Sequence, residues 1–574
     1  MEILLDPYAA RSCPVKTHNR HDRTVERPRS QPDEALTELF AGGRTFGGEV
    51  LELLSAGKDV ADLRGVDDPA EAERLTLEAL AAGRAVVLCP RLPDDPVGHR
   101  TGSPDALVRS CTLDDTGHGY RAVEAKRHRV QEMGHGEHPC HWSPLADPTT
   151  ESVAWQMTIK ASREADLLQL AHYWRLLEAC GHADPSMVAG LVGTDHVEGH
   201  AGLVVSWVQL DRKMIRTYSR TAATGWKLRS PMERYEHEFG FRLKVAQVAA
   251  RRTGAVDDPR PMVQPIVIRE CEQCTWWEAC KPQLDDDDLS LRISKSPLDV
   301  REISVLRSHG INTLADLADA DVESLMDSYL PEVGHRSGAD SRLRLAARRA
   351  SLMLAGVQLE RLATDPVDLP EASLEIDLDI ETSAADRVYL WGFLVDDRTR
   401  SGEPYYKSFS RFAEMDNAAE VALAAEAITW LDTMLRLHPD ARVYHYSDYE
   451  VVHLLRLAER CSKPEVLAAA RRVRRHFVDL FDLVKGHFFG THGLGLKVVA
   501  RSGPGFEWRD EDPGGLNSQA WFREAVQDQD PEVRERARTR VLEYNEDDVR
   551  ATHQVRAWLR TLDEAKPDAG VPQS

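Results

Sequence analysis

Two groups of acidic side chains in this sequence have the spacing of divalent-metal ligands. The first group pairs Asp105, which follows Pro104, with Glu124 and Lys126. The second group lies further along the chain and comprises Asp379, Glu381, Glu450, Tyr544 and Asp548. Carboxylate oxygens are hard ligands that suit Mg²⁺ or Mn²⁺, and cations held in this way assist phosphodiester hydrolysis. Each group therefore predicts a centre for metal-dependent cleavage of phosphodiesters.

The first group requires a β-hairpin to bring its members together. Residues 106–113 read as a strand, residues 114–119 as a turn, and residues 120–126 as a second strand. The hairpin would bring the two carboxylates together, and alternation along the second strand places Glu124 and Lys126 on one face. The lysine can then orient water or stabilise the pentavalent transition state.

The second group requires several strands from different parts of the chain. Residues 374–381 alternate in the manner of a strand, and the end of that strand presents Asp379 and Glu381. Residues 387–395 read as the next strand and residues 443–446 as a further one. The alternation of strands and helices in this region predicts an α/β domain.

The remaining members of the second group fall on predicted helices. Glu450 follows the strand at residues 443–446 and begins a helix, whereas Tyr544 and Asp548 lie within a long helical segment at residues 531–562. A separation of four residues places Tyr544 and Asp548 on the same helix face. Asp479 is a further candidate ligand, because it also follows a short apolar segment.

Three cysteines between the two groups have metal-ligand spacing. They are Cys271, Cys274 and Cys280, in the pattern C-x2-C-x5-C. A four-thiolate site needs one more ligand, and Cys13 is the best candidate. Four thiolates can bind either zinc or an iron–sulfur cluster, so both alternatives stay open from the spacing alone.

Composition is that of an ordinary globular protein. The 574 residues are 42% hydrophobic and 29% charged, and no apolar run approaches the roughly 20 residues of a membrane span. The start of the chain lacks a secretory pattern, so we expect a cytoplasmic protein whose nine cysteines are thiols and ligands rather than disulfides. The net charge of −22 argues against broad phosphate contacts, although residues 126–129, 342–349 and 471–475 form locally basic clusters.

The first group and the cysteines together resemble the RecB-like branch of the PD-(D/E)XK nuclease superfamily. The resemblance is strengthened by Gln169-x3-Tyr173 on the predicted helix at residues 162–180, since this pattern supports the active site and contacts DNA in that branch. It implies a restriction-endonuclease-like domain with Asp105, Glu124, Lys126, Gln169 and Tyr173 as site residues. It also implies that Cys13, Cys271, Cys274 and Cys280 bind a structural 4Fe–4S cluster, which we favour over zinc.

The second group resembles the DnaQ-like 3′–5′ exonucleases, a branch of the RNase H-like fold. The segment Tyr544 to Ala551, Tyr-Asn-Glu-Asp-Asp-Val-Arg-Ala, is most similar to the YprB-like domains. The resemblance implies that four carboxylates (Asp379, Glu381, Glu450 and Asp548) hold two metal ions, and that Tyr544 orients the attacking water. Glu450 departs from the pattern, because most members have aspartate there.

Four segments follow from these assignments. We predict a RecB-like nuclease domain at residues 1–290, a helical connector at 291–368, an RNase H-like domain at 369–562 and a disordered tail at 563–574. The acidic run at residues 285–288 reads as a solvated linker. Within the connector, residues 306–314 resemble a helix-hairpin-helix, a motif whose turn amides bind phosphates.

The predicted function is a Mg²⁺- or Mn²⁺-dependent nuclease, most simply an exonuclease, that acts on single-stranded DNA or DNA ends in repair or recombination. The sequence has no Gly-x4-Gly-Lys-Ser/Thr phosphate loop, so unwinding would need a separate helicase. Two alternatives remain. One is a nucleic-acid-binding scaffold with decayed centres, and the other is an RNA-directed 3′–5′ exonuclease that uses only the C-terminal centre.

Overall fold

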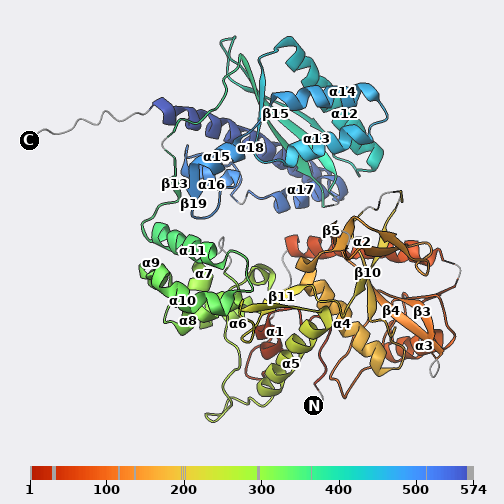
Figure 1. Ribbon diagram of the computed structural model, residues 1–574. Coiled ribbons are helices and arrows are strands. Elements are labelled where there is room, and N and C mark those ends of the chain that lie inside the picture. The colour runs from red at the N-terminus through yellow and green to blue at the C-terminus, as the bar shows by residue number, and fades with distance from the viewer. Residues whose placement is uncertain are drawn as a thin grey trace, which may run out of the picture. The chain divides into compact units, whose positions relative to one another are not determined.

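A computed structural model of the chain describes residues 3–28, 34–57, 59–113, 117–134, 137–195, 197, 199–200, 202–293, 298–363, 365–384, 386–511 and 513–564. The chain folds into two compact units. The N-terminal unit comprises residues 1–32 and 40–347, and the C-terminal unit comprises residues 33–39 and 348–574. Both units combine helices with a β-sheet (Figure 1). Most of the predicted tail, residues 565–574, lies outside the described residues.

The main sheet of the N-terminal unit has the strand order β1-β2-β3-β4-β9-β10-β6-β7 in the described part of the chain. Its strands are β1 (Val60–Asp62), β2 (Val86–Leu88), β3 (Ala106–Leu113), β4 (Gly117–Ala125), β6 (Cys140–Pro144), β7 (Ser152–Ala154), β9 (Val188–Val192) and β10 (Val204–Gln209). The predicted hairpin is confirmed, because β3 and β4 pair in antiparallel register. Strand β9 is parallel to β4, so the chain must cross over between them, and it does so through a helix.

That crossover helix is α4 (Glu164–Ala179), which agrees with the predicted helix at residues 162–180. It is buried on nearly every side, with Tyr173 and Leu177 against one part of the core and Leu170 and Trp174 against another. The other helices of this region are α1 (Pro14–His21), α2 (Glu34–Ser55), α3 (Pro69–Ala81), α5 (Pro231–Ala249), α6 (Trp277–Cys280) and α7 (Leu289–Arg292). Two small sheets pair β5 (Gln131–Met133) with β8 (Met157–Ile159), and β11 (Ile215–Tyr218) with β12 (Trp226–Arg229).

The segment predicted as a connector, residues 291–368, contains several helices, and its turn differs from a phosphate-binding one. Its helices are α8 (Val300–Ser308), α9 (Leu314–Asp319), α10 (Val322–Val333) and α11 (Ala339–Leu354). Between α8 and α9, Gly310 adopts a left-handed conformation with φ of +80°. The backbone amides of Asn312 and Thr313 both donate to the Asp316 carboxylate at 2.9 Å. These turn amides are therefore already occupied by an anion that the chain itself supplies.

The acidic run at residues 285–288 is not a fully solvated linker, contrary to the prediction. Asp288 is buried, caps α7 and pairs with Arg307 at 2.8 Å. Spacing alone did not reveal the arginine partner.

The C-terminal unit is built on a sheet with the order β16-β15-β14-β17-β18. These strands are β14 (Leu374–Thr382), β15 (Val388–Asp397), β16 (Tyr405–Ser410), β17 (Arg442–His445) and β18 (Phe477–Asp479). Strands β14, β17 and β18 are parallel, whereas β15 is antiparallel to both of its neighbours. The strands predicted near residues 374–381, 387–395 and 443–446 are confirmed. A separate pair joins β13 (Leu359–Arg361) to β19 (Phe488–Gly490).

Helices cover both faces of this sheet (Figure 1). One face packs against α12 (Asn417–Leu437), α13 (Tyr449–Arg460) and α14 (Pro464–Val473). The other face packs against α15 (Leu480–His487), α16 (Leu496–Ser502), α17 (Gly515–Gln527) and α18 (Pro531–Glu564). The long predicted helix at residues 531–562 is confirmed as α18. No described helix in either unit combines the length and the apolar character that crossing a bilayer requires.

Strand β14 separates apolar from acidic side chains because its residues alternate between faces. Leu374, Ile376, Leu378 and Ile380 are buried in the core beneath α12, α13 and α14. The intervening residues all carry carboxylates and face α18, namely Glu375, Asp377, Asp379 and Glu381. Along α18, residues at intervals of three or four share one face, and those that meet the carboxylates of this strand include Asn545, Asp548, His553, Arg556 and Arg560. The two elements therefore bring one polar stripe against another.

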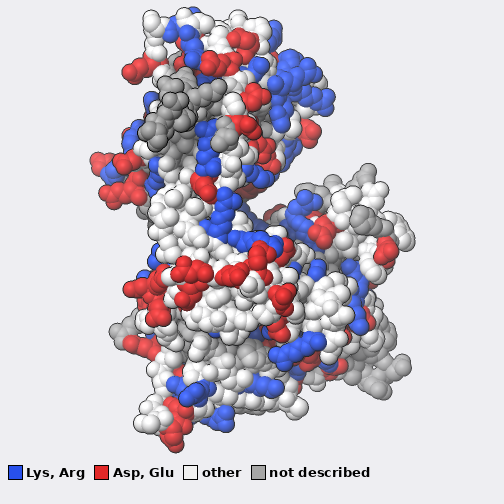
Figure 2. Space-filling view, turned by 60° about the vertical axis from the view of Figure 1, so that its left-hand side comes forward, with Lys and Arg blue, Asp and Glu red and all other residues white. Residues whose placement is uncertain are grey.

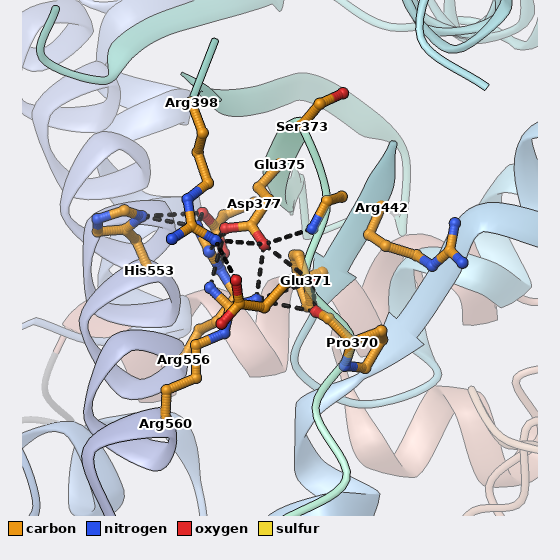
Figure 3. A network of polar contacts seen from close by, with 12 residues as sticks. Pro370, Glu371, Ser373, Glu375, Asp377, Arg398, Arg442, His553, Arg556 and Arg560 are labelled. Atoms are coloured by element: carbon orange, nitrogen blue, oxygen red, sulfur yellow. Dashed lines mark hydrogen bonds and ion pairs between the residues drawn. The ribbon is translucent and has the colours of Figure 1, made fainter. Parts of the chain in front are cut away.

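Arginines neutralise the first half of the acidic stripe (Figure 3). Arg556 is 1% exposed, donates to Asp377 at 2.9 and 3.2 Å and also contacts Glu375. Arg560 donates to both oxygens of Glu375 at 2.6 and 3.0 Å, and His553 Nδ1 lies 3.4 Å from Asp377. Despite the opposing effect of burial, these cations hold the pKa of both carboxyls below the ordinary range.

Replacing Arg556 should destabilise β14 and α18 strongly. The change Arg556→Met leaves Asp377 buried without its main cation, and removing one partner of such a pair costs about 3–5 kcal/mol. The matched control is Arg398→Met, since Arg398 is 42% exposed and lies 3.7 Å from Glu375, where an ion pair contributes about 0–1 kcal/mol. Amide hydrogen exchange of β14 and α18 peptides in the full chain measures both changes. Equal effects of the two substitutions would contradict this description of the network.

Candidate metal centres

The second half of the acidic stripe forms the best-defined candidate metal site. Asp379 and Glu381 come from the end of β14, and Asp548 comes from α18. One ligand atom from each of these three residues lies within 4.8 Å of the other two. Glu381 and Asp548 are buried, whereas Asp379 is partly exposed. Three oxygen ligands at this separation suit a hard divalent cation such as Mg²⁺ or Mn²⁺.

Neutral donors, rather than cations, hold these three carboxylates in place. The hydrogen bonds run from Asn545 Nδ2 to Asp379 Oδ2 (2.6 Å), from Ser518 Oγ to Glu381 Oε2 (2.7 Å) and from Trp508 Nε1 to Asp548 Oδ1 (2.7 Å). A second layer fixes two of the donors: Tyr406 donates to Asn545 at 2.7 Å, and Tyr389 lies 2.8 Å from Ser518. The three side chains are therefore oriented by donors that carry no positive charge.

Electrostatic repulsion in this centre favours a bound cation. Burial, followed by the charge of Asp548, raises the pKa of Glu381 to about 8. Burial, followed by the charges of Asp548, Glu381 and Glu450, raises the pKa of Asp379 well above its ordinary value, and burial likewise raises that of Asp548. Like charges that cannot all ionise in a buried site are relieved by a divalent cation. The donor set and its electrostatics thus both fit Mg²⁺ or Mn²⁺.

Tyr544 lies beside these carboxylates, one turn of α18 before Asp548. Its hydroxyl accepts a hydrogen bond from Lys497 Nζ at 2.8 Å. Burial, followed by the charge of Asp548, raises the pKa of Tyr544, so the phenol stays protonated. The predicted residues Asp379, Glu381, Tyr544 and Asp548 are therefore brought together.

Glu450 and Asp479 lie at the margin of this cluster. Glu450 is buried at the start of α13, and its Oε2 lies 3.7 Å from His445 Nδ1 without accepting a hydrogen bond. It acts on Asp379 through its charge. Asp479 caps α15 and accepts from the amides of Phe481 (2.8 Å) and Ser447 (3.1 Å). Its carboxylate thus serves the backbone instead of the cluster.

The first predicted group also gathers, at the end of the β3–β4 hairpin. Asp105 accepts from the amide of Ala125 at 2.8 Å, and Lys126 Nζ lies 3.0 Å from Glu124 Oε2. The same Nζ donates to Gln169 Oε1 at 2.9 Å, and Gln169 Nε2 donates to the Tyr173 hydroxyl at 3.2 Å. Burial, followed by the charge of Asp105, raises the pKa of Glu124 to about 7. All five predicted residues belong to one connected set.

Three further residues, Arg11, His128 and Asp166, extend this set. Arg11, in the segment before α1, donates to Gln169 Oε1 and lies 3.7 Å from Asp166. Asp166 is buried on α4, and His128 lies 2.8 Å from it. Arg11 also borders a cavity of about 440 Å³ lined by Tyr8, Lys16, Arg20 and Trp276, among others. The N-terminal segment is thereby tied to the first centre.

The four cysteines singled out in the sequence line one small apolar pocket with Trp276 and Trp277. Cys13 precedes α1, and the other three lie on and around α6. Glu270 ties the two segments, because it accepts from the Cys13 amide at 2.9 Å and pairs with Lys16 at 2.5 Å. Burial raises the pKa of Cys13 to about 11, so this thiol would deprotonate only with a compensating cation. The donor set fits a soft metal or an iron–sulfur cluster.

Most of the site residues that the sequence did not reveal are hydrogen-bond donors that position the carboxylates or Tyr544. Asn545 could have been found, because it lies inside the Tyr544–Asp548 run. Lys497, Trp508 and Ser518 come from α16, from the loop after it and from α17, where no spacing pattern marks them. Only the tertiary structure brings them to β14.

The Glu381→Gln variant should be more stable than the wild type without metal at high pH. The pKa of Glu381 is about 8 in the fold and about 4.5 ordinarily, so the folded state binds this proton more tightly. The wild type therefore loses stability as pH rises from about 4.5 to about 8, whereas the neutral amide does not. In EDTA at pH 9 the variant should gain roughly 1 kcal/mol or more.

Thermal unfolding in EDTA at pH 4 and pH 9 measures this difference, and the gain should vanish at pH 4. Adding Mn²⁺ at pH 9 should reverse the order, because a ligand stabilises the state that binds it. A variant that is less stable than the wild type at both pH values in EDTA would show that ionising Glu381 does not destabilise the fold.

Comparison with known families supports the C-terminal centre. Residues 377–560 match the family model of the RNase H superfamily, a range that contains Asp379, Glu381, Glu450, Tyr544 and Asp548. Neither curated proteins nor solved structures gave a match to the chain. The predicted RNase H-like fold is thus confirmed for this region. Residues 377–560 form an RNase H-like domain, and its acidic cluster fits the divalent-cation site of a metal-dependent nuclease.

Proposed function

We propose that this chain is a divalent-metal-dependent nuclease with two centres that hydrolyses DNA, as an exonuclease on single strands or strand ends. The observation that carries the proposal is the convergence of Asp379, Glu381 and Asp548 in the RNase H-like domain with neutral donors only. Such a cluster costs free energy unless a cation binds to it.

At the C-terminal centre a bound Mg²⁺ or Mn²⁺ would supply Lewis acidity for activating water and for stabilising charge on the leaving oxygen. The side chains of the chain do the rest. Asn545, Ser518 and Trp508 fix the carboxylates, and the Tyr544 hydroxyl holds the attacking water. The water oxygen would then bond to phosphorus while the bond to the leaving oxygen breaks, and the proton that the water loses would end on that leaving oxygen. This chemistry is that of the DnaQ-like and YprB-like proteins which the sequence resembles.

The N-terminal unit is proposed to be a RecB-like PD-(D/E)XK nuclease domain. Its support is the connected set of Asp105, Glu124, Lys126, Gln169 and Tyr173. Asp105 and Glu124 would bind the cation, and Lys126 would orient water or stabilise the developing charge. Arg11 adds a second cation that holds Gln169.

The cysteine pocket is proposed to hold a 4Fe–4S cluster. In support, Cys13 and the C-x2-C-x5-C segment line the same pocket although more than 250 residues separate them. The cluster would staple α1 to the α6 region and thereby position Arg11 beside the first centre. Its role is therefore structural, and zinc is the competing occupant.

Nucleic acid is the proposed partner despite the acidic composition. On the face drawn in Figure 2, basic and acidic side chains are interspersed instead of uniformly acidic. Beside the first centre, Arg127 and Arg129 are exposed and can contact phosphates. A role in repair or recombination and a separate helicase remain part of the proposal through the resemblance alone.

Cleavage assays with single-residue variants test the nuclease proposal. Labelled single-stranded DNA and a matched RNA are incubated with Mn²⁺ and with wild type, Lys126→Ala, Asp548→Asn or the control Glu465→Gln. In each centre variant, the cleavage rate due to the mutated centre should fall by about 100-fold or more. Glu465 is exposed on α14, so the Glu465→Gln variant should match the wild type.

Cleavage that survives when Lys126→Ala and Asp548→Asn are combined in one chain would contradict both centres. Binding of the strands without any Mn²⁺-dependent cleavage would replace the nuclease by a binding scaffold. Cleavage of RNA alone, lost only in Asp548→Asn, would favour the RNA-directed exonuclease.

Metal analysis of protein purified without oxygen tests the cluster. We expect a brown protein with about four iron and four sulfide per chain, and Cys13→Ser should lose most of this iron. Cys461→Ser serves as the control, because Cys461 packs against the apolar core of the C-terminal unit and does not line the cysteine pocket. Stoichiometric zinc without iron would overturn the cluster assignment while leaving the nuclease proposal intact.

A further inference from the structure

Lys497 occupies an unusual position at the C-terminal centre. It lies in the first turn of α16, and its Nζ donates to the carbonyl of Pro513 at 2.9 Å and to the Tyr544 hydroxyl at 2.8 Å. Both acceptors are neutral oxygens, and among the described residues no carboxylate lies at hydrogen-bond distance from this ammonium. The ammonium also lies 4.8 Å from the centre of the Tyr544 ring.

The charge of Lys497 reaches every member of the acidic cluster. It acts to lower the pKa of Asp379, Glu381 and Asp548, against the larger effect of burial. The network of Figure 3 differs, because there arginines bind Glu375 and Asp377 directly. At the metal end of β14, the Lys497 ammonium donates to the Tyr544 hydroxyl instead of to a carboxylate of the cluster. The carboxylate oxygens therefore remain available to a metal ion.

Glu450 does not complete a four-carboxylate arrangement. It stands outside the group of atoms within 4.8 Å, and its buried Oε2 lies 3.7 Å from His445 Nδ1 without a hydrogen-bond partner among the described residues. In two-metal nucleases the second cation lies about 3.5–4 Å from the first. Here three carboxylates converge and a lysine supplies the additional positive charge.

We propose that the C-terminal centre binds one divalent cation through Asp379, Glu381 and Asp548, and that Lys497 is a positioning residue whose ammonium holds Tyr544 and stands in for a second cation. This inference rests on the proposed nuclease function. Because Nζ–H donates to the Tyr544 oxygen, the Tyr544 O–H must point away from Lys497. It then donates toward Asp548 or the attacking water, which fixes the orientation of the nucleophile.

Manganese titration of the full chain tests the inference separately from cleavage. The substitution Asp105→Asn silences the N-terminal centre, so that calorimetry and electron paramagnetic resonance count the ions of the C-terminal one. In this background we expect one Mn²⁺ per chain without spin coupling, lost in Asp548→Asn. Lys497→Met should bind Mn²⁺ about tenfold more tightly or accept a second ion, since a repelling charge is gone. Its cleavage should nevertheless fall about 100-fold.

Tighter binding with lost cleavage is the signature that a purely structural role would not give. Lys485→Met is the matched control, because Lys485 is exposed on α15, and it should change neither quantity. Lys497→Arg should restore part of the cleavage. Two spin-coupled Mn²⁺ ions in the Asp105→Asn background, or weaker Mn²⁺ binding in Lys497→Met, would overturn the inference.

Different results would overturn the proposed nuclease function and the role of Lys497. Absence of Mn²⁺ binding that depends on Asp548 would overturn the proposed function as well, whereas two bound ions would overturn only the role of Lys497. Should Lys497→Met fail to fold, as judged by circular dichroism, the ion count in the Asp105→Asn background decides by itself.

Discussion

The contact between β14 and α18 is the constraint on which the C-terminal site depends. Two residues along a strand advance about 6.6 Å and four along a helix about 6 Å, so the acidic stripe of β14 and the polar stripe of α18 stay in register over several turns. Arg556 and Arg560 fix one end by neutralising Asp377 and Glu375. The other end then necessarily places Asp548 against Asp379 and Glu381. The arginine-paired half of the stripe thus fixes the position of the half that carries Asp379 and Glu381, which have no arginine partner in the described part of the chain.

Both candidate centres place carboxylates beside a lysine, yet they use it differently. Lys126 pairs directly with Glu124 at 3.0 Å and with Gln169. Lys497 instead donates to Tyr544, so its effect on the carboxylates acts through space. The raised pKa values of Glu124 and Glu381 have the same leading cause, which is burial. In each unit, burial thus favours the protonated carboxyl unless a nearby positive charge compensates it.

Local patterns predicted the elements well, and long-range charge pairing escaped them. The hairpin, α4, β14 and α18 followed from alternation and helical spacing, because those signals lie within one segment. The same spacing placed Tyr544 and Asp548 correctly on one face. Lys497, Ser518 and Trp508 could not be predicted, since each reaches the centre from a different segment through tertiary packing. Asp288 was taken for a linker residue for the same reason, as its partner Arg307 lies on another helix.

Anomalous diffraction from crystals grown with Mn²⁺ tests the central claim most directly. The account predicts a manganese peak about 2.0–2.3 Å from oxygens of Asp379, Glu381 and Asp548, with no peak beside Glu375 and Asp377, whose charge Arg556 and Arg560 already neutralise. A peak elsewhere in the C-terminal unit, or none at Mn²⁺ concentrations that support cleavage, would contradict the assignment of this half of the stripe as the metal centre.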